Sequence, residues 1–208
     1  MNARTQHDVR TPQQQRARDK VRRLVAAAQR CFNANGYAGT TMAKIARTAK
    51  VSTGTAYAYF VDKDDLLAHV LRQHADSLLT PGEEIVESLP ARASLRKTLE
   101  RVVAVALVSA KHERGLHRVF HERIVEDPNL QSLAIQYRER GLLLGRRLVE
   151  RFGGACARRD IDAAAEIVVG LLDFCTHVGV LYPAAVSPER ACAAGIDMLV
   201  EYLSAERR

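Results

Sequence analysis

Apolar residues recur at helical spacing from residue 13 onward. In the first such stretch they fall at i, i+3, i+4, i+7 and i+11, the spacing of one buried helix face: Val21, Leu24, Val25, Ala28 and Phe32. Asn35-Gly36 follows directly, and these residue types commonly end helices. The sequence therefore predicts a first helix of roughly 20 residues that ends at Asn35.

Two shorter helical segments follow. Thr40 or Thr41 can cap a helix over TTMAKIARTA, and Ser52 can cap another over STGTAYAYF. A fourth helix is predicted from Lys63 to about Leu79. Two short helices joined by a turn of about three residues, with another helix after them, form a helix-turn-helix arrangement.

The remaining two-thirds of the chain carries only helical patterns. Long apolar-periodic segments predict helices at residues 93–112, 115–125, 128–152, 161–181 and 187–204. Turn-forming residues separate the helical segments: Pro81-Gly82, Pro90, Asp127-Pro128, Gly153-Gly154 and Pro183. The predicted fold class is all-α with about nine helices, divided into a domain over 13–62 and a helical domain over 63–208.

Charge separates the same two parts of the chain. Residues 1–62 hold eleven Lys and Arg against three Asp and Glu, whereas residues 63–208 hold twenty against twenty-one. A basic module on a near-neutral body indicates a phosphate backbone as the partner of that module. Residues 1–12 are predicted to be a flexible basic arm; its arginines, with Arg16 and Arg18, could enter a minor groove or remain solvated.

Overall composition gives a soluble, cytoplasmic protein as the expectation. The chain has 208 residues, 47% of them hydrophobic, yet no apolar run reaches the ~18–20 residues of a membrane span. The N-terminal segment lacks the apolar stretch of a signal peptide. Four widely spaced cysteines without a CxxC pair are expected to be reduced and mostly buried: Cys31, Cys156, Cys175 and Cys192.

The stretch VSTGTAYAYF, residues 51–60, has the chemistry of a DNA-reading helix. The second short helix of a helix-turn-helix lies in the major groove, where its N-terminal residues reach base edges. Hydroxyls of Ser52, Thr53 and Thr55 can bond to base edges, and Gly54 permits close approach of the backbone. Tyrosine hydroxyls and a lysine can hold phosphates, unless a tyrosine packs in the core: Tyr57, Tyr59 and Lys63.

Residues 36–67 resemble the DNA-binding domain of TetR-family transcriptional repressors. The shared positions are Gly36, Tyr37, Thr41, Ile45, Ala46, Ala49, Val51, Ser52, Gly54, Tyr57, Tyr59, Phe60, Lys63 and Leu66. The resemblance implies a regulator and not an enzyme, without a cofactor, whose partner is a double-stranded DNA operator. The DNA-binding residues it implies, together with two nearby lysines, are Thr41, Lys44, Lys50, Ser52, Thr53, Gly54, Thr55, Tyr57, Tyr59 and Lys63.

Lys50 departs from the family pattern, which usually has glycine in the turn. If the turn keeps a left-handed conformation, a non-glycine residue costs roughly 1 kcal/mol or more there. Either the turn differs or Lys50 contributes a contact, and a phosphate contact is the hypothesis.

The last two predicted helices are apolar over more than one face, which implies a second packing partner. The resemblance implies that this partner is a second copy, with a four-helix bundle at the interface; a helix buried inside a monomer is the alternative. The predicted interface residues are Val168, Leu171, Leu172, Cys175, Ile196, Leu199, Val200 and Leu203.

The resemblance also implies a small-molecule effector that enters the C-terminal body and releases the DNA. Aromatic and polar residues on otherwise aliphatic helices are the candidate pocket, with plain core packing as the alternative: Phe120, His121, Tyr137, Phe174 and His177. Neither the effector nor the choice between repression and activation follows from the sequence.

A histidine cluster supports a second hypothesis, a metal-responsive sensor or metal-dependent enzyme. His117 and His121 stand at i, i+4 with His112 nearby, a spacing that can hold zinc or nickel. Such pairs are usually solvated and no third ligand is specified, so no metal site is predicted. Asp173, Cys175 and His177 alternate, which sends them to different helix faces.

Overall fold

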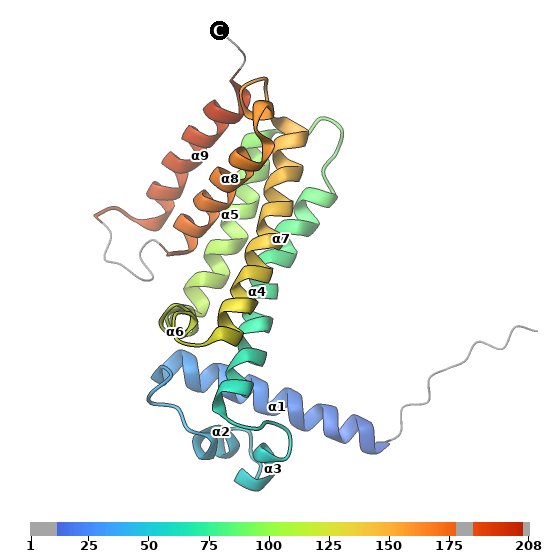
Figure 1. The fold of residues 1–208 in the computed structure, drawn as a ribbon, viewed down its shortest axis with the longest axis vertical. Coiled ribbons are helices and arrows are strands. Elements are labelled where there is room, and N and C mark those ends of the chain that lie inside the picture. The colour runs from blue at the N-terminus through green and yellow to red at the C-terminus, as the bar shows by residue number, and fades with distance from the viewer. Residues whose placement is uncertain (1–11, 178–184, 206–208) are drawn as a thin grey trace, which may run out of the picture. The chain divides into compact units, whose positions relative to one another are not determined.

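The structure, a computed structural model, describes residues 12–177 and 185–205. The described residues form nine α-helices and one short 3-10 helix, and they contain no strand (Figure 1). The all-α prediction is confirmed. The chain divides into two compact units, residues 1–70 and 71–208, so the division falls inside the fourth helix and not at its start. The proposed arm over residues 1–12 lies outside the described residues except for Pro12.

The N-terminal unit contains α1 (Pro12–Asn35), α2 (Met42–Thr48), α3 (Thr53–Tyr57) and the start of α4 (Lys63–Glu87). Local chemistry sets these boundaries as predicted. Gly36 ends α1 with a φ of 67°, a left-handed conformation that glycine adopts without a steric penalty. Thr41 Oγ1 accepts from Lys44 N at 3.2 Å and caps α2, and Ser52 Oγ accepts from Thr55 N at 3.1 Å and caps α3.

Apolar side chains from all four helices fill the core of this unit. The largest fully buried ones include Leu24, Phe32, Ile45, Leu66 and Leu67, with Ala56 and Phe60 from α3 and its C-terminal end. The predicted face of α1 is therefore its buried face, and only Val21 of that set is partly exposed. Removing these side chains from water fixes α2 and α3 against α1.

The C-terminal unit contains α5 (Leu95–His112), α6 (Arg114–Ile124), α7 (Pro128–Phe152), α8 (Ile161–His177) and α9 (Pro188–Ser204). Figure 1 shows α5, α7, α8 and α9 side by side. Side-chain oxygens of Ser94, Asp127 and Ser187 cap α5, α7 and α9. The five predicted ranges are confirmed to within a few residues, apart from the end of α8, where residues 178–181 lie outside the described part of the chain.

The α7 and α8 helices approach each other closely through small residues. A Cβ atom on Gly145 would lie 2.9 Å from the carbonyl oxygen of Ala165 and 3.2 Å from its Cα, so only glycine fits there. One turn away, Gly141 faces Val169. The backbones are therefore in near contact, and α8 also packs against α5 and α9.

The residues predicted for a dimer interface lie instead in the core of the C-terminal unit. Leu172 and Val200 are half-buried. The other six are buried: Val168, Leu171, Cys175, Ile196, Leu199 and Leu203. Within one copy of the chain, α5, α7 and the contact between α8 and α9 cover the inward stripes of these two helices. A second apolar stripe remains exposed on the same helices: Ile167, Phe174, Met198 and Tyr202.

The α4 helix continues through the Pro81-Gly82 pair, where the sequence predicted a break, and ends at Glu87. A proline inside a helix removes one backbone hydrogen bond and costs about 3 kcal/mol. The tertiary structure offsets this cost because α7 holds α4 on both sides of Pro81. Gly82 itself packs against Leu144 and Val102.

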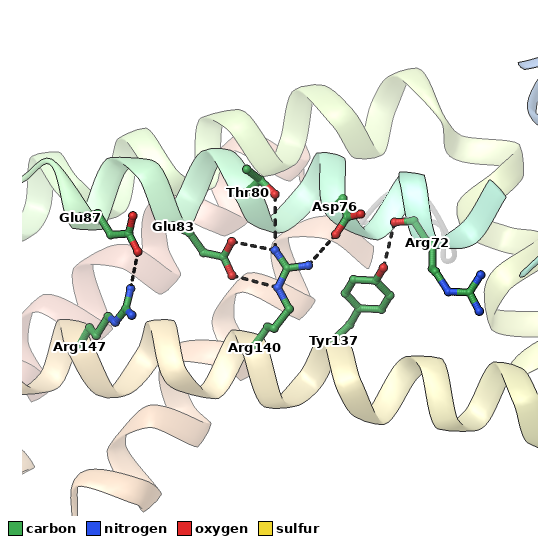
Figure 2. A network of polar contacts seen from close by, with 8 residues as sticks. All are labelled: Arg72, Asp76, Thr80, Glu83, Glu87, Tyr137, Arg140 and Arg147. Atoms are coloured by element: carbon green, nitrogen blue, oxygen red, sulfur yellow. Dashed lines mark hydrogen bonds and ion pairs between the residues drawn. The ribbon is translucent and has the colours of Figure 1, made fainter. Parts of the chain in front are cut away.

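Arg140 of α7 makes the principal polar contact with α4 (Figure 2). Its guanidinium donates to Glu83 at 3.1 and 2.7 Å, to Asp76 at 2.6 Å and to Thr80 at 3.4 Å. These partners precede and follow Pro81. The same face carries the Arg147–Glu87 pair and a hydrogen bond from Tyr137 to the carbonyl of Arg72 (Figure 2).

None of the described helices is both long and apolar enough to cross a lipid bilayer. The four cysteines form no disulfide; Cys31, Cys175 and Cys192 are buried and Cys156 is partly exposed, as predicted.

Replacement of Arg140 by Ala should lower the free energy of unfolding by about 1–2 kcal/mol, because it leaves two partly desolvated carboxylates without their cation. Arg147→Ala is the matched control. Its ion pair with Glu87 is more exposed, so it should cost less than about 0.5 kcal/mol. Urea denaturation of both variants measures the difference, and equal losses would show that the network around Arg140 does not hold α4.

Candidate nucleic-acid interface and internal cavity

The N-terminal end of α3 presents a row of accessible hydroxyl groups. Ser52, Thr53 and Gly54 are exposed, and Thr55 is half-buried with its Oγ1 2.8 Å from Ser52 Oγ. Farther along, 54% of Tyr57 is exposed to solvent, whereas Tyr59 is half-buried. Ser52 and Thr55 already bond to each other, and hydroxyls exposed at the start of a helix are the groups with which a base-reading helix contacts base edges.

Lys50 occupies the turn between α2 and α3 with a φ of 56°, the only positive φ of a non-glycine residue in the described chain. Its amide still donates to Arg47 O at 3.1 Å, so the left-handed turn is retained with lysine in it. The exposed side chain leaves the turn towards solvent. The amide of Val51 donates to Ala46 O at 3.0 Å, so the left-handed residue closes α2 with backbone hydrogen bonds on both sides of it.

Two other lysines predicted to contact DNA are bound within the N-terminal unit. Lys44 Nζ donates to Asn35 Oδ1 at 2.7 Å and to the carbonyl of Gly39 at 3.2 Å. Lys63 Nζ donates to the carbonyl of Tyr37 at 3.1 Å and lies 3.6 Å from the centre of that ring. Both ammonium groups thus hold the loop that follows α1, and their charge remains close to the surface.

Tyr37 organises this loop, a role that sequence reasoning did not assign. Its hydroxyl donates to Asp64 at the start of α4, and its ring stacks on Phe32 with the centroids 6.3 Å apart. Thr41 is exposed at the N-terminus of α2.

Arg16 and Arg18 are exposed residues of α1 and not parts of a preceding arm, while Arg4 and Arg10 lie outside the described residues.

The C-terminal unit encloses a cavity of about 330 Å³ between α4, α5, α6, α7 and α8. Four of the five predicted pocket residues line it: Phe120, His121, Tyr137 and His177. The fifth, Phe174, does not line the cavity, because its position on α8 turns it outward, where 47% of the side chain is exposed. Most of the lining is aliphatic, and Leu71, Val102 and Leu144 contribute from three helices.

Four histidines and one glutamate meet at one side of this cavity. His74 Nδ1 donates to Glu113, and His74 Nε2 lies 3.4 Å from His117 Nδ1. His121 Nε2 lies 2.5 Å from His177 Nε2, and the ring centroids of these two residues are 4.3 Å apart. Residues from α4, α6 and α8 therefore converge, with Glu113 from the junction of α5 and α6.

Burial and mutual proximity lower the pKa of two of these imidazoles, those of His117 and His121. Burial, reinforced by His121, His177 and His74, lowers the pKa of His117 to about 3. Burial, with smaller contributions from His177 and His74, lowers the pKa of His121 to about 4. Both rings consequently carry a lone pair at neutral pH.

The composition of the cluster differs from the sequence hypothesis. His112 is exposed at the end of α5 and does not belong to it. His117, expected on a solvated face, is buried, with 4% of its surface exposed. His74 and His177 come from helices far away along the chain, and no local spacing could have indicated that they meet His117.

The comparisons with known proteins agree with the surface on α3. Residues 24–70 match the family described as bacterial regulatory proteins, tetR family. The chain is 30% identical over 157 residues to the HTH-type transcriptional regulator BetI of Paraburkholderia phymatum, covering 73% of this chain and 80% of BetI. It is 32% identical over 112 residues to the HTH-type transcriptional regulator HbdR of Aromatoleum sp., and this match spans about half of each protein, 49%.

Solved structures share the fold at lower sequence identity. A transcriptional regulator from Rhodococcus sp. Rha1 superposes with a TM-score of 0.72 at 19% identity, covering 89% of this chain and 98% of that one. A TetR-family transcriptional regulator from Streptomyces coelicolor gives a TM-score of 0.70 at 21% identity, covering 90% and 97%. The helical architecture therefore extends over both units.

Lys50→Gly should raise the free energy of unfolding by about 1 kcal/mol, because glycine adopts the left-handed turn without strain. Lys50→Ala removes the same charge but keeps the strain, so it should not stabilise the protein. If Lys50 contacts a phosphate, both variants should lower the salt dependence of DNA binding by about one unit of slope for each bound subunit. An unchanged slope in both would exclude that contact, and equal stabilities of the two variants would exclude strain as the cause.

Proposed function

Because the chain belongs to the tetR family of bacterial regulatory proteins and is a transcriptional regulator, we propose that it acts as a dimeric repressor. In this proposal it binds a pseudo-palindromic operator in double-stranded DNA and is released by a small-molecule ligand. The observation that carries the proposal is the exposed hydroxyl row of α3, which begins at Ser52 in the basic unit. Members of this family regulate transcription and are not enzymes.

Each part of the N-terminal unit has a separate task in DNA binding. Thr53, Gly54 and Thr55 face the base edges from the first turn of α3, where hydroxyls and a close backbone can distinguish bases. Tyr57 and Tyr59 reach phosphates, as does Thr41 at the N-terminus of α2, where unpaired amides favour an anion. Further phosphate contacts are assigned to the remaining hydroxyl and the three lysines: Ser52, Lys44, Lys50 and Lys63. The ammonium groups of Lys44 and Lys63 would contact a phosphate while they also donate hydrogen bonds to Asn35 and Tyr37 at the α1–α2 loop.

The dimer forms through the outer faces of α8 and α9. Ile167, Gly170 and Phe174 follow one another at i, i+3 and i+7 on α8, and all three are exposed. Met198 and Tyr202 form the corresponding stripe on α9, at i and i+4. Pairing of these stripes in two copies would make a four-helix bundle with two-fold symmetry, which presents two α3 helices to two half-sites.

The cavity of the C-terminal unit receives the effector. Its volume, about 330 Å³, and its aliphatic lining with a few polar groups suit a small organic molecule. The α4 helix lines the cavity and continues without a break into the DNA-binding unit. A ligand that favours a different position of α4 needs a coupling free energy of only about 1–3 kcal/mol to weaken DNA binding.

Selection of sheared genomic DNA by the purified protein tests the repressor proposal. The wild-type protein should enrich an inverted repeat at physiological salt. Tyr57→Ala should lose two phosphate contacts per dimer, about 2 kcal/mol or roughly thirty-fold in affinity, and fail to enrich the site. Tyr57→Phe isolates the hydroxyl, and Thr53→Ala should relax the preference at one position of each half-site. The proposal would be contradicted if the wild-type protein enriched no sequence and its DNA binding disappeared in modest salt. The N-terminal unit would then bind DNA only through its net positive charge.

A charge placed in the exposed stripe of α8 tests the dimer. Ile167→Glu should yield a monomer in sedimentation equilibrium, because two buried carboxylates would face each other across the two-fold axis. Ile135→Glu is the matched control, since Ile135 is similarly exposed on α7, outside the proposed interface. A monomeric wild-type protein, or a dimer that both variants leave intact, would contradict the proposed interface.

A further inference from the structure

We propose that His117, His121 and His177 bind a divalent transition metal ion of the zinc class, with His74 and Glu113 orienting His117. The site lies at the side of the cavity formed by α6 and α8. It is independent of the proposed function, because a metal can bind there whether or not DNA is released.

The three histidines already have the spacing of metal ligands. One ring nitrogen from each residue lies within 4.8 Å of the other two. Tetrahedral zinc with Zn–N bonds of about 2.0–2.1 Å places its ligand atoms roughly 3.3 Å apart. The Nε2 atoms of His121 and His177, which are 2.5 Å apart, would separate to this distance around a bound ion.

His117 carries the strongest sign of a missing ligand. Its Nε2 is buried and has no hydrogen-bond partner among the described residues. A buried polar atom without a partner is unfavourable by about 1–3 kcal/mol, so proteins rarely keep one without a use. A metal ion at this nitrogen would satisfy it.

His74 and Glu113 fix the tautomer that a metal requires. A carboxylate can only accept, so His74 carries its proton on Nδ1, and the Nε2 of the neutral ring is an acceptor. His117 Nδ1 then donates to His74 Nε2, across the 3.4 Å between them. This leaves the lone pair of His117 on Nε2, and it reproduces the carboxylate–histidine support common behind metal-bound imidazoles.

Carboxylates near the three histidines favour a bound cation. Glu113 lies behind His74, and Asp173 lines the cavity together with Arg138, whose Nη1 is 3.9 Å from Asp173 Oδ2. A divalent cation among neutral imidazoles and these carboxylates is electrostatically favourable.

The three nitrogen ligands indicate which class of metal ion the site can bind. Three imidazole nitrogens suit Zn²⁺, Ni²⁺, Co²⁺ or Cu²⁺, whereas Mg²⁺ and Ca²⁺ require oxygen ligands. Three protein ligands leave at least one coordination position for water in the cavity. Because His117 and His121 belong to α6 and His177 to α8, bound metal would tie these two helices together.

Titration of full-length, chelator-stripped protein with ZnCl₂ in a calorimeter tests the site. One ion per chain should bind with a Kd on the order of 1 µM or tighter, and MgCl₂ should give no heat. At a hundred-fold excess over Kd, zinc should raise Tm by about 5–10 °C. CoCl₂ should give the visible absorption bands of tetrahedral nitrogen coordination.

Matched variants locate the binding. The double variant His121→Gln, His177→Gln should lose at least a hundred-fold in affinity while its metal-free Tm stays near that of the wild type, since both side chains are only partly buried. His112→Gln should bind as the wild type does. His74→Leu should weaken binding about 10–100-fold without abolishing it.

Two results would overturn the proposal: no zinc binding by the wild-type protein, or equal binding by the double variant, which would place the ion elsewhere. DNA selection performed in excess chelator separates this outcome from a failure of the repressor proposal.

Discussion

The near contact between α7 and α8 is the constraint on which the C-terminal unit depends. Gly145 has no room for a Cβ against the backbone of Ala165, so the two helices can interdigitate only at this register. Once the register is fixed, the inward stripe of α8 must face α5, α7 and α9, and Val168 and Cys175 become core. The same register places Ile167 and Phe174 on the outer face of α8 and His177, in its last turn, at the cavity.

This register gives α8 three different faces. Its core face stabilises the unit, its outer face leaves Ile167 and Phe174 exposed, and its last turn brings His177 to His121 of α6. An apolar helix that satisfied only its own core would need no second stripe. The surplus of apolar surface and the buried histidines are thus separate features, and they support the proposed dimer and the proposed metal site respectively.

The α4 helix shows how tertiary contacts override a local signal. Pro81 and Gly82 would end a helix in isolation, but Arg140 bonds to α4 residues on both sides of the proline (Figure 2). A continuous α4 matters for the proposed function because it is the one helix shared by the two units. In the N-terminal unit, by contrast, tertiary contacts use side chains that the sequence assigned to DNA, since Lys44 and Lys63 both bond to the α1–α2 loop.

The sequence by itself determined the helices, apart from the end of α4, together with their caps and the short helix within residues 51–60. These features depend on local spacing and on single residues such as Gly36, Thr41 and Ser52, whose effects act within one or two turns. The left-handed conformation of the turn at Lys50 could be anticipated only by analogy with glycine at that position.

Tertiary structure alone decided which apolar stripe of α8 is buried, whether α4 passes Pro81, and which histidines meet. A stripe of apolar residues shows that a helix face will be covered, but not by which partner, and most of the residues predicted for the interface are buried within one copy of the chain. His74, His117 and His177 are separated by tens of residues, and only the packing of α4, α6 and α8 brings their rings together.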